Sequence, residues 1–219
     1  MKNQSQDQFS VQEDQPSNWF EPLYAGSDVY GEGVPWANME THPSFGRWLS
    51  KNPLKGEGKS ALVVGCGMGD DAIKLEALGF QVTAFDVSAT AIKFCKERFP
   101  HSKVEFLCAD LFENPHQWQH QFDFVLEIFT VQALPPKYER ETIGKISDFV
   151  APGGVILVIA LVGIEERSFE NGPPWLLTSK HIDSFVSCGL KVLGKYVERG
   201  SLKADEPDTY VTSFKRSDS

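Results

Sequence analysis

The chain has 219 residues, 41% of them hydrophobic, which is the length and composition of one soluble globular domain. Its 21 basic and 30 acidic residues give a formal net charge of −9, which disfavours nucleic acid or an anionic membrane as the main partner. The four cysteines lie far apart without a CxxC pair, so neither a disulfide framework nor a metal site is predicted. Three of them stand in apolar runs, where we expect small, reduced core residues.

Residues 1–17 are rich in Gln, Ser and Asp, which predicts a disordered or loosely ordered tail before a single domain at 18–219. The tail has neither the apolar stretch of a signal peptide nor the arginines of a transit peptide. The longest apolar run, at 155–164, is too short to span a bilayer. We therefore expect a cytoplasmic protein without a membrane partner, either a monomer or a weak oligomer.

Aromatic residues gather in the first segment of the domain, residues 18–52: Trp19, Phe20, Tyr24, Tyr30, Trp36, Phe45 and Trp48. Because so many rings are costly to leave in water, this segment must pack on the rest of the domain. We expect an N-terminal lid that ends in a helix at 43–51. The alternative is that the rings simply complete the core.

From residue 61 onward, short apolar runs alternate with helical segments. The predicted strands lie at 61–64, 81–85, 104–108, 122–128, 155–161, 190–197 and 209–214. The predicted helices lie at 70–78, 88–98, 136–150 and 179–187. Apolar strands separated by helices indicate a parallel sheet covered on both faces. The sequence therefore predicts an α/β fold with a doubly wound, mostly parallel, seven-stranded sheet that ends in one or two antiparallel strands.

A glycine-rich turn, Gly65-Cys66-Gly67-Met68-Gly69, joins the first of these strands to the next helix. Glycines in this place let backbone N–H groups approach a ligand beyond the carboxyl end of the strand. Asp86 ends the second strand, where a carboxylate accepts hydrogen bonds from ribose in nucleotide-binding α/β folds. The turn alone is weak evidence, but the two features together predict a nucleoside-containing ligand.

The spacing of the glycines separates two classes of such ligand. A dinucleotide site has the pattern G-x-G-x-x-G and holds a pyrophosphate at the helix N-terminus. Here Gly69 comes one residue early, and Asp70 and Asp71 follow it. Two carboxylates in this position repel a pyrophosphate and suit a cation. S-Adenosylmethionine, with a sulfonium, an ammonium and no phosphate, therefore fits better than a nicotinamide dinucleotide.

Two further carboxylates follow strands at the same edge of the sheet. Asp110 comes after the third strand, where it can receive an adenine amino group or merely cap a turn. Glu127 ends the fourth strand, either beside the amino-acid part of the cofactor or as a solvated strand end. We expect the cofactor role for Asp110, and both interpretations of Glu127 remain open from its position alone.

Residues 62–154 resemble the class I S-adenosylmethionine-dependent methyltransferases. Two flanking motifs, Gly33-Val34-Pro35-Trp36 and Gly172-Pro173-Pro174-Trp175, are similar to those of the thiopurine, thiol and halide methyltransferases. The resemblance extends over residues 19–190. It implies S-adenosyl-L-methionine as the cofactor and S-adenosyl-L-homocysteine as its product.

The resemblance also implies roles for particular residues. The implied cofactor-binding residues are Tyr30, Trp36, Gly65, Gly67, Asp86, Asp110, Leu111 and Glu127, with Tyr30 and Trp36 folding over the cofactor from the lid. Trp175 would close the pocket, and Ile128 would lie against the acceptor. Thiopurine methyltransferases carry an arginine at the position of Ile128, and the halide and thiol members carry an aromatic residue there.

The predicted cleft is mostly apolar, and no histidine is embedded in one of its motifs. A sulfonium is already an activated methyl donor, so transfer mainly needs alignment and a dehydrated site. These features favour a small, soft acceptor that needs no general base: a thiol, a thiopurine-like compound or a halide. Glu127 is the one catalytic candidate, and no metal is predicted.

Other functions remain open. The same fold can methylate oxygen, nitrogen or a carboxylate of a small metabolite. The chain could also bind S-adenosylmethionine without turnover, although lid and loop elements that enclose a reacting centre argue against this. A nicotinamide-dependent oxidoreductase is disfavoured by the glycine spacing, and a protein or nucleic-acid substrate by the lack of a basic surface or an additional domain.

Overall fold

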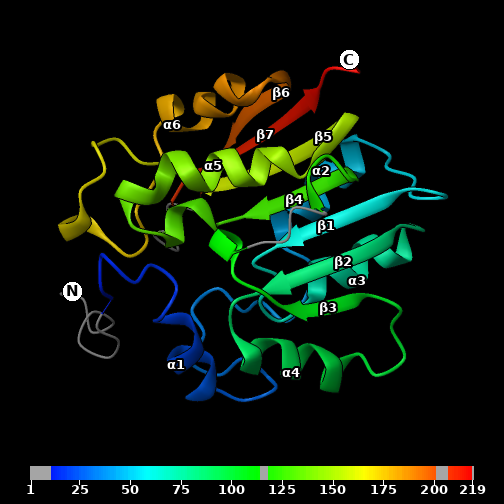
Figure 1. Cartoon of the computed structure of the whole chain (residues 1–219), viewed down its shortest axis with the longest axis horizontal. Coiled ribbons are helices and arrows are strands. Elements are labelled where there is room, and N and C mark those ends of the chain that lie inside the picture. The colour runs from blue at the N-terminus through cyan, green and yellow to red at the C-terminus, as the bar shows by residue number, and fades with distance from the viewer. Residues whose placement is uncertain (1–10, 114–117, 201–206, 219) are drawn as a thin grey trace.

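The computed structural model of the chain describes residues 11–113, 118–200 and 207–218. Its centre is one seven-stranded sheet in the order β3-β2-β1-β4-β5-β7-β6 (Figure 1). The strands are β1 (Ser60–Val64), β2 (Gln81–Asp86), β3 (Glu105–Cys108), β4 (Phe122–Ile128), β5 (Val150–Leu161), β6 (Leu190–Glu198) and β7 (Thr209–Arg216). Strands β1 to β5 are parallel, and β7 runs antiparallel between β5 and β6. The predicted fold class is confirmed.

Helices cover both faces of this sheet. They are α1 (Phe20–Ala25), α2 (Pro43–Lys51), α3 (Asp70–Ala77), α4 (Ala89–Arg98), α5 (Glu139–Asp148) and α6 (Ser179–Asp183). Helices α2, α3 and α4 pack on one face, and α5 lies across the other (Figure 1). Leu62 and Val64 point to the α5 side while Ala61 and Val63 point to the α3 side. This two-sided burial explains why β1 is apolar throughout.

Short 3₁₀ helices account for two departures from the predicted elements. They are η1 (Leu111–Glu113), η3 (Val131–Ala133), η4 (Pro136–Tyr138), η5 (Phe169–Asn171) and η6 (Ser184–Cys188). The helix predicted at 136–150 begins as η4 and becomes α-helical at Glu139, and Pro136 keeps the residue before it extended, so the helix does not begin earlier. The helix predicted at 179–187 likewise divides into α6 and η6.

Local signals placed other elements correctly. Strand β4 has the predicted bounds, and Ser88 caps α4 by accepting a hydrogen bond from Ala91 N at 3.0 Å. The expected burial of the cysteines is confirmed for Cys95 but is wrong for Cys108, which is exposed. Cys108 ends β3, the edge strand of the sheet, so only one side of it is covered.

The predicted tail at 1–17 lies partly outside the described residues. Residues 11–17 form turns with a bridge between Gln12 and Gln15, and Asp14 accepts a hydrogen bond from Lys137. The boundary between the tail and a domain at 18–219 stays a prediction. Within the described ranges, every helix is too short or too polar to cross a bilayer.

Candidate functional site

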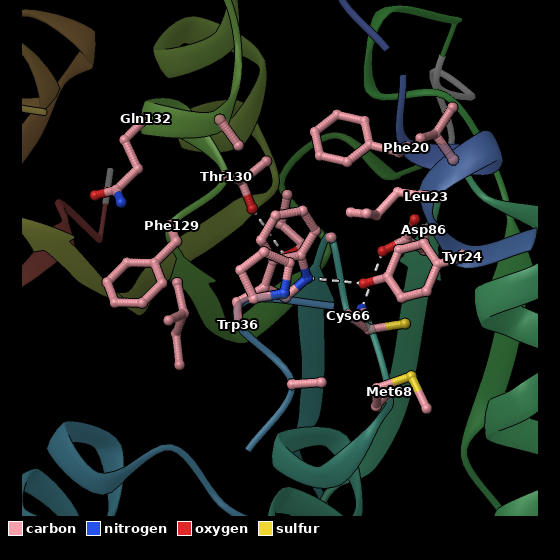
Figure 2. A pocket seen from close by; sticks show the side chains of 18 of the residues that line it. Phe20, Leu23, Tyr24, Trp36, Cys66, Met68, Asp86, Phe129, Thr130 and Gln132 are labelled. Atoms are coloured by element: carbon pink, nitrogen blue, oxygen red, sulfur yellow. Dashed lines mark hydrogen bonds between the residues drawn. The ribbon is translucent and has the colours of Figure 1, made fainter. Parts of the chain in front are cut away.

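A cavity of about 510 Å³ lies at the carboxyl ends of β1, β2 and β4 (Figure 2). Ligands bind at this edge in open parallel sheets. The floor is the turn at 64–71 together with Asp86, and the segment from Trp19 to His42 contributes the cover. Residues after β3 and β4 form the walls.

The turn between β1 and α3 needs its glycines. Gly65, Gly67 and Gly69 have positive φ angles of 59°, 52° and 86°, which residues with a Cβ rarely adopt. A Cβ on Gly65 would stand 2.8 Å from Thr130 Oγ1, and one on Gly67 would stand 3.0 Å from the Tyr24 hydroxyl. The backbone of the two predicted residues, Gly65 and Gly67, therefore faces the cavity closely.

Asp86 ends β2 below the cavity and is 6% exposed. Its Oδ2 accepts a hydrogen bond from Gly67 N at 3.0 Å, and its Oδ1 accepts one from Ser88 N at 2.9 Å. Burial raises the pKa of Asp86, against the lowering effect of these two bonds. Each oxygen keeps room for one more donor, so the carboxylate is fixed and able to receive two hydroxyl groups.

The two carboxylates that open α3 have different partners. Asp70 forms a bidentate ion pair with Arg98, with both N–O distances at 2.7 Å. The predicted repulsion of a pyrophosphate therefore rests on Asp71, because the charge of Asp70 is compensated. Asp71 Oδ1 accepts a hydrogen bond from His42 N at 2.8 Å, and burial raises the pKa of Asp71 to about 7.

Glu127 is completely buried at the end of β4, beside Val64, and does not line the cavity. The interpretation as a solvated strand end is therefore wrong. Its Oε1 accepts hydrogen bonds from Thr130 N at 2.7 Å and Val131 N at 3.1 Å, which fixes the start of η3. Its Oε2 has no partner among the described residues, and burial raises the pKa of Glu127 to about 7. The cofactor and catalytic roles of Glu127 stay predictions.

After β3, Ala109, Leu111 and Phe112 line the cavity, but Asp110 does not. Asp110 Oδ1 accepts a hydrogen bond from Phe112 N at 2.7 Å. This is the local turn-capping arrangement typical of an aspartate two residues before the donor. The predicted contact of Asp110 with adenine stays a prediction.

Aromatic residues from the first segment cover the cavity. Trp36 Nε1 donates a hydrogen bond to the Tyr24 hydroxyl at 2.9 Å, and Trp19 and Phe20 pack edge-on to Trp36 with ring centroids 5.7 and 6.2 Å away. Tyr30, which was expected to fold over the cofactor, is 77% exposed and does not line the cavity. Its predicted contact with the cofactor stays a prediction.

The aromatic residues of the segment at 18–52 contribute both to the core and to the lining of the cavity. Phe45 and Trp48 of α2 pack against Phe124 in the core under the sheet, whereas Trp36 lines the cavity. Helix α1 is tied to the start of α4, because the Glu21 carboxylate accepts hydrogen bonds from the hydroxyls of Ser88 and Thr90, both at 2.6 Å.

Trp36 stands between two groups of side chains in Figure 2, with Tyr24 and Asp86 on one side and Phe129 and Gln132 on the other. We call the second side the acceptor end; its residues are His42, Ile128, Phe129, Gln132, Leu161, Pro173 and Pro174. Phe129 has a φ of 65°, a costly conformation for a bulky residue that tends to occur at functional sites.

Ile128 lines the acceptor end but Trp175 does not, and the predicted contact of Ile128 with an acceptor stays a prediction. Trp175 is 1% exposed, donates from Nε1 to Phe169 O at 3.1 Å and stacks on the Phe169 ring. Its backbone N donates to Gln132 O at 2.7 Å. Trp175 thus anchors the loop whose two prolines face the cavity, and its contact with an acceptor stays a prediction.

Sequence reasoning missed two polar residues of the acceptor end, His42 and Gln132. The His42 ring lies edge-on to Phe129 at 5.1 Å, and its Nδ1 accepts a hydrogen bond from Ser44 N at 3.3 Å as the N-cap of α2. Burial, followed by the charge of Arg47, lowers the pKa of His42 to about 4. The position before Pro43 signals a helix start, but no sequence signal places either residue in the cavity.

The described ranges contain no group of three or more His, Cys, Asp or Glu side chains that could hold a metal ion.

Comparisons with known proteins agree with this geometry. A family profile described as a methyltransferase domain matches residues 61–154. The chain is 26% identical over 155 residues to carboxy-S-adenosyl-L-methionine synthase of Shewanella loihica, covering 67% of this chain and 61% of the synthase. It is 26% identical over 171 residues to probable thiol methyltransferase 2 of Arabidopsis thaliana, covering 75% of this chain and 69% of that methyltransferase. It is 28% identical over 152 residues to a tRNA N(3)-cytidine methyltransferase of Danio rerio, covering 63% and 43%.

A solved structure supports the fold over almost the whole chain. It comes from work on the conversion of a disulfide bond into a thioacetal group during echinomycin biosynthesis, with a TM-score of 0.72, 19% identity and 92% of each chain covered. The chain spans only 61% of the length of the Shewanella loihica synthase. The matched profile shows that residues 61–154 form a methyltransferase domain, and the strand order and the glycine turn at the cavity agree with this assignment.

Proposed function

We propose that this chain transfers a methyl group from S-adenosyl-L-methionine to a small molecule that is a soft nucleophile, namely a thiol, a thiopurine-like compound or a halide. The bound cofactor supplies a methyl group that its sulfonium already activates. The residues of the chain then have to bind the cofactor, orient the acceptor and exclude water.

Two features fit this cofactor. Gly65 and Gly67 line the cavity with backbone in the left-handed region, so the turn presents main-chain groups there. The Asp86 carboxylate is held by two backbone N–H groups and can accept from two ribose hydroxyls.

The observation that carries the choice of acceptor is the chemistry of the acceptor end. Its walls are mostly apolar, and His42 is the one basic side chain among the described residues that line the cavity. With a pKa of about 4, His42 is neutral and only a weak base at pH 7. A thiolate or halide needs no base, so this environment suits such acceptors.

A second candidate function rests on Asp71. Its carboxyl group lines the cavity and has a pKa near 7, the range in which a general base works best at neutral pH. Asp71 would then remove a proton from a hydroxyl or amine acceptor. Methylation of a small-molecule oxygen, nitrogen or carboxylate is therefore the alternative to a soft acceptor.

The lining also favours a small molecule over a tRNA. Nucleic-acid binding draws much of its affinity from Lys and Arg contacts to phosphates, and neither residue type occurs among the described residues that line the cavity. The net charge of −9 acts in the same direction.

The decisive experiment measures methyl transfer from labelled S-adenosyl-L-methionine to hydrosulfide, aliphatic and aromatic thiols, iodide, amines, alcohols and carboxylates, with Asp86→Ala as the control. We expect turnover of the sulfur or halide acceptors that disappears in the variant. Turnover of amines or alcohols alone, with an acid limb near pH 7 in the rate profile, would favour the second candidate. Cofactor binding without any turnover would indicate a non-catalytic binding protein.

A further inference from the structure

The acceptor end contains a buried amide whose orientation is fixed. Gln132 of η3 is 2% exposed, and its Oε1 accepts a hydrogen bond from Leu161 N at 2.7 Å. Because a backbone N–H can only donate, the side-chain oxygen must face Leu161 and the NH₂ group must face elsewhere.

The NH₂ group of Gln132 is available to a ligand. Its Nε2 makes no hydrogen bond within the described residues, yet it is not among the side-chain atoms that are sealed from solvent without a partner. Since Gln132 lines the cavity and is otherwise buried, we infer that the small exposed part of the amide faces the cavity. Figure 2 shows the amide on the same side of Trp36 as Phe129.

The short helix that carries Gln132 is held from three directions. Glu127 Oε1 accepts from the backbone at its start. Arg167 Nη2 donates to Val131 O at 3.0 Å and to Leu134 O at 3.1 Å. Trp175 N donates to Gln132 O. A donor fixed in this way loses little freedom when a ligand binds, which is the property of a recognition group.

The charges around the cavity restrict what this donor can recognise. Among the described residues, four carboxylates line the cavity, those of Glu40, Asp70, Asp71 and Asp86, and of these only Asp70 forms an ion pair, with Arg98. Lys and Arg are absent from the described lining residues. A carboxylate or phosphate on the acceptor would lose its water there without gaining a counter-ion.

We propose that the acceptor end selects a thiol that is uncharged apart from its reacting sulfur, and that Gln132 Nε2 donates a hydrogen bond to an oxygen near that sulfur. This inference rests on the proposed function and narrows its substrate class. Thiols that carry an amide or hydroxyl oxygen are favoured over those that carry a carboxylate.

Three thiols of equal length separate these properties: 3-mercaptopropionamide, 1-propanethiol and 3-mercaptopropionate. Rates are expressed per thiolate, so that the different thiol pKa values do not enter. We expect the amide to have the highest kcat/KM and the carboxylate the lowest, with about 10-fold or more between them.

The variant Gln132→Glu keeps the oxygen that accepts from Leu161 N and replaces the donor by a second oxygen. We expect the amide-to-propanethiol ratio of kcat/KM to fall about 10-fold. Gln132→Met, which lacks both polar atoms, should lower the ratio similarly and shows whether the added charge matters. Gln121→Glu, an exposed residue next to the start of β4, is the matched control and should leave the ratio at its wild-type value.

The outcomes are distinct. A preference for the amide that Gln132→Glu and Gln132→Met both remove supports the inference. Turnover of 1-propanethiol with equal or better turnover of the carboxylate, or an amide preference that survives both variants, overturns the inference alone. Absence of turnover with these thiols overturns the inference, and absence of turnover with aromatic thiols and iodide as well, in protein that still binds S-adenosyl-L-homocysteine, overturns the proposed soft-acceptor function.

Discussion

The two ends of the cavity are built in different ways. The side of Trp36 with Tyr24 and Asp86, which we call the cofactor end, presents the backbone of one turn, at Gly65 and Gly67, and one carboxylate, Asp86, which that turn itself holds in place. The acceptor end joins side chains from distant segments, with His42 from before α2, Gln132 from η3 and two prolines from the loop after β5. The first end depends on local backbone geometry, and the second depends on how the whole chain folds.

This difference explains how one fold accommodates several chemistries. A change in the glycine turn alters the position of the backbone itself, so few substitutions are tolerated there. A side chain at the acceptor end can change with little effect on the sheet below it. Relatives named as a synthase, a thiol methyltransferase and a tRNA methyltransferase are consistent with this separation.

The largest expected effect is the loss of cofactor affinity in Asp86→Ala. The substitution removes a carboxylate that can accept from two ribose hydroxyls and leaves Gly67 N without its acceptor. We expect the affinity for S-adenosyl-L-homocysteine, measured by titration calorimetry, to fall about 100-fold or more.

Asp123→Ala is the matched control for Asp86→Ala. Asp123 also accepts a hydrogen bond from a backbone N–H, that of Ser60 at 2.8 Å, but at the opposite end of the sheet. An equal loss of affinity in both variants would mean that Asp86 acts through the stability of the fold and not through the ligand.

The next effect concerns stability and pH. The pKa of Asp71 is about 7 in the folded protein against an ordinary value of 3.8, so the native state binds more protons than the unfolded state between these values. The free energy of unfolding must therefore fall as pH rises through this window, by at most about 1.4 kcal/mol per pH unit for one group. The pKa of Glu127 is also raised, so its ionisation likewise lowers the free energy of unfolding as pH rises.

Urea denaturation at pH 5 and pH 7 tests this. The variant Asp71→Asn keeps an oxygen that can accept from His42 N. From pH 5 to pH 7, we expect its free energy of unfolding to decrease by about 2 kcal/mol less than that of the wild type. Equal losses in both proteins would show that Asp71 is ionised and solvated at pH 5.

Trp36→Phe tests the cover of the cofactor end and should have a smaller effect. The variant keeps an aromatic ring but loses the hydrogen bond from Nε1 to the Tyr24 hydroxyl. We expect the affinity for S-adenosyl-L-homocysteine to fall about 5- to 10-fold, as for one buried hydrogen bond. The same exchange at Trp48, which packs on Phe124 in the core, should lower stability without changing that affinity.

The cofactor end could be predicted from the sequence because its signals are local. Gly65, Gly67 and Asp86 are recognised from spacing along two strands, and the same periodicity predicted the parallel sheet. Asp110 and Glu127 were found by the same rule, but strand ends do not reveal which way a carboxylate turns. One oxygen of each carboxylate accepts from the backbone of the next turn.

The acceptor end could not be predicted in this way. Gln132 and His42 stand in no motif, and they enter the cavity only because η3 and the start of α2 pack beside it. Tyr30 shows the same dependence: it is close in sequence to Trp36, yet it is exposed because the turns between them direct it to solvent. Side-chain direction in loops depends on tertiary packing, which residue spacing does not encode.

His42 gives the smallest expected effect and separates a structural role from a role toward the acceptor. His42→Ala removes the N-cap of α2 and should lower the free energy of unfolding by about 0.5–1 kcal/mol. His42→Asn restores a good N-cap without the ring that lies against Phe129. If Asn recovers stability while kcat/KM for thiols stays low, the ring contributes to the acceptor end. If His42→Asn recovers both stability and kcat/KM, His42 acts only as a helix cap, and recognition of the acceptor rests on η3.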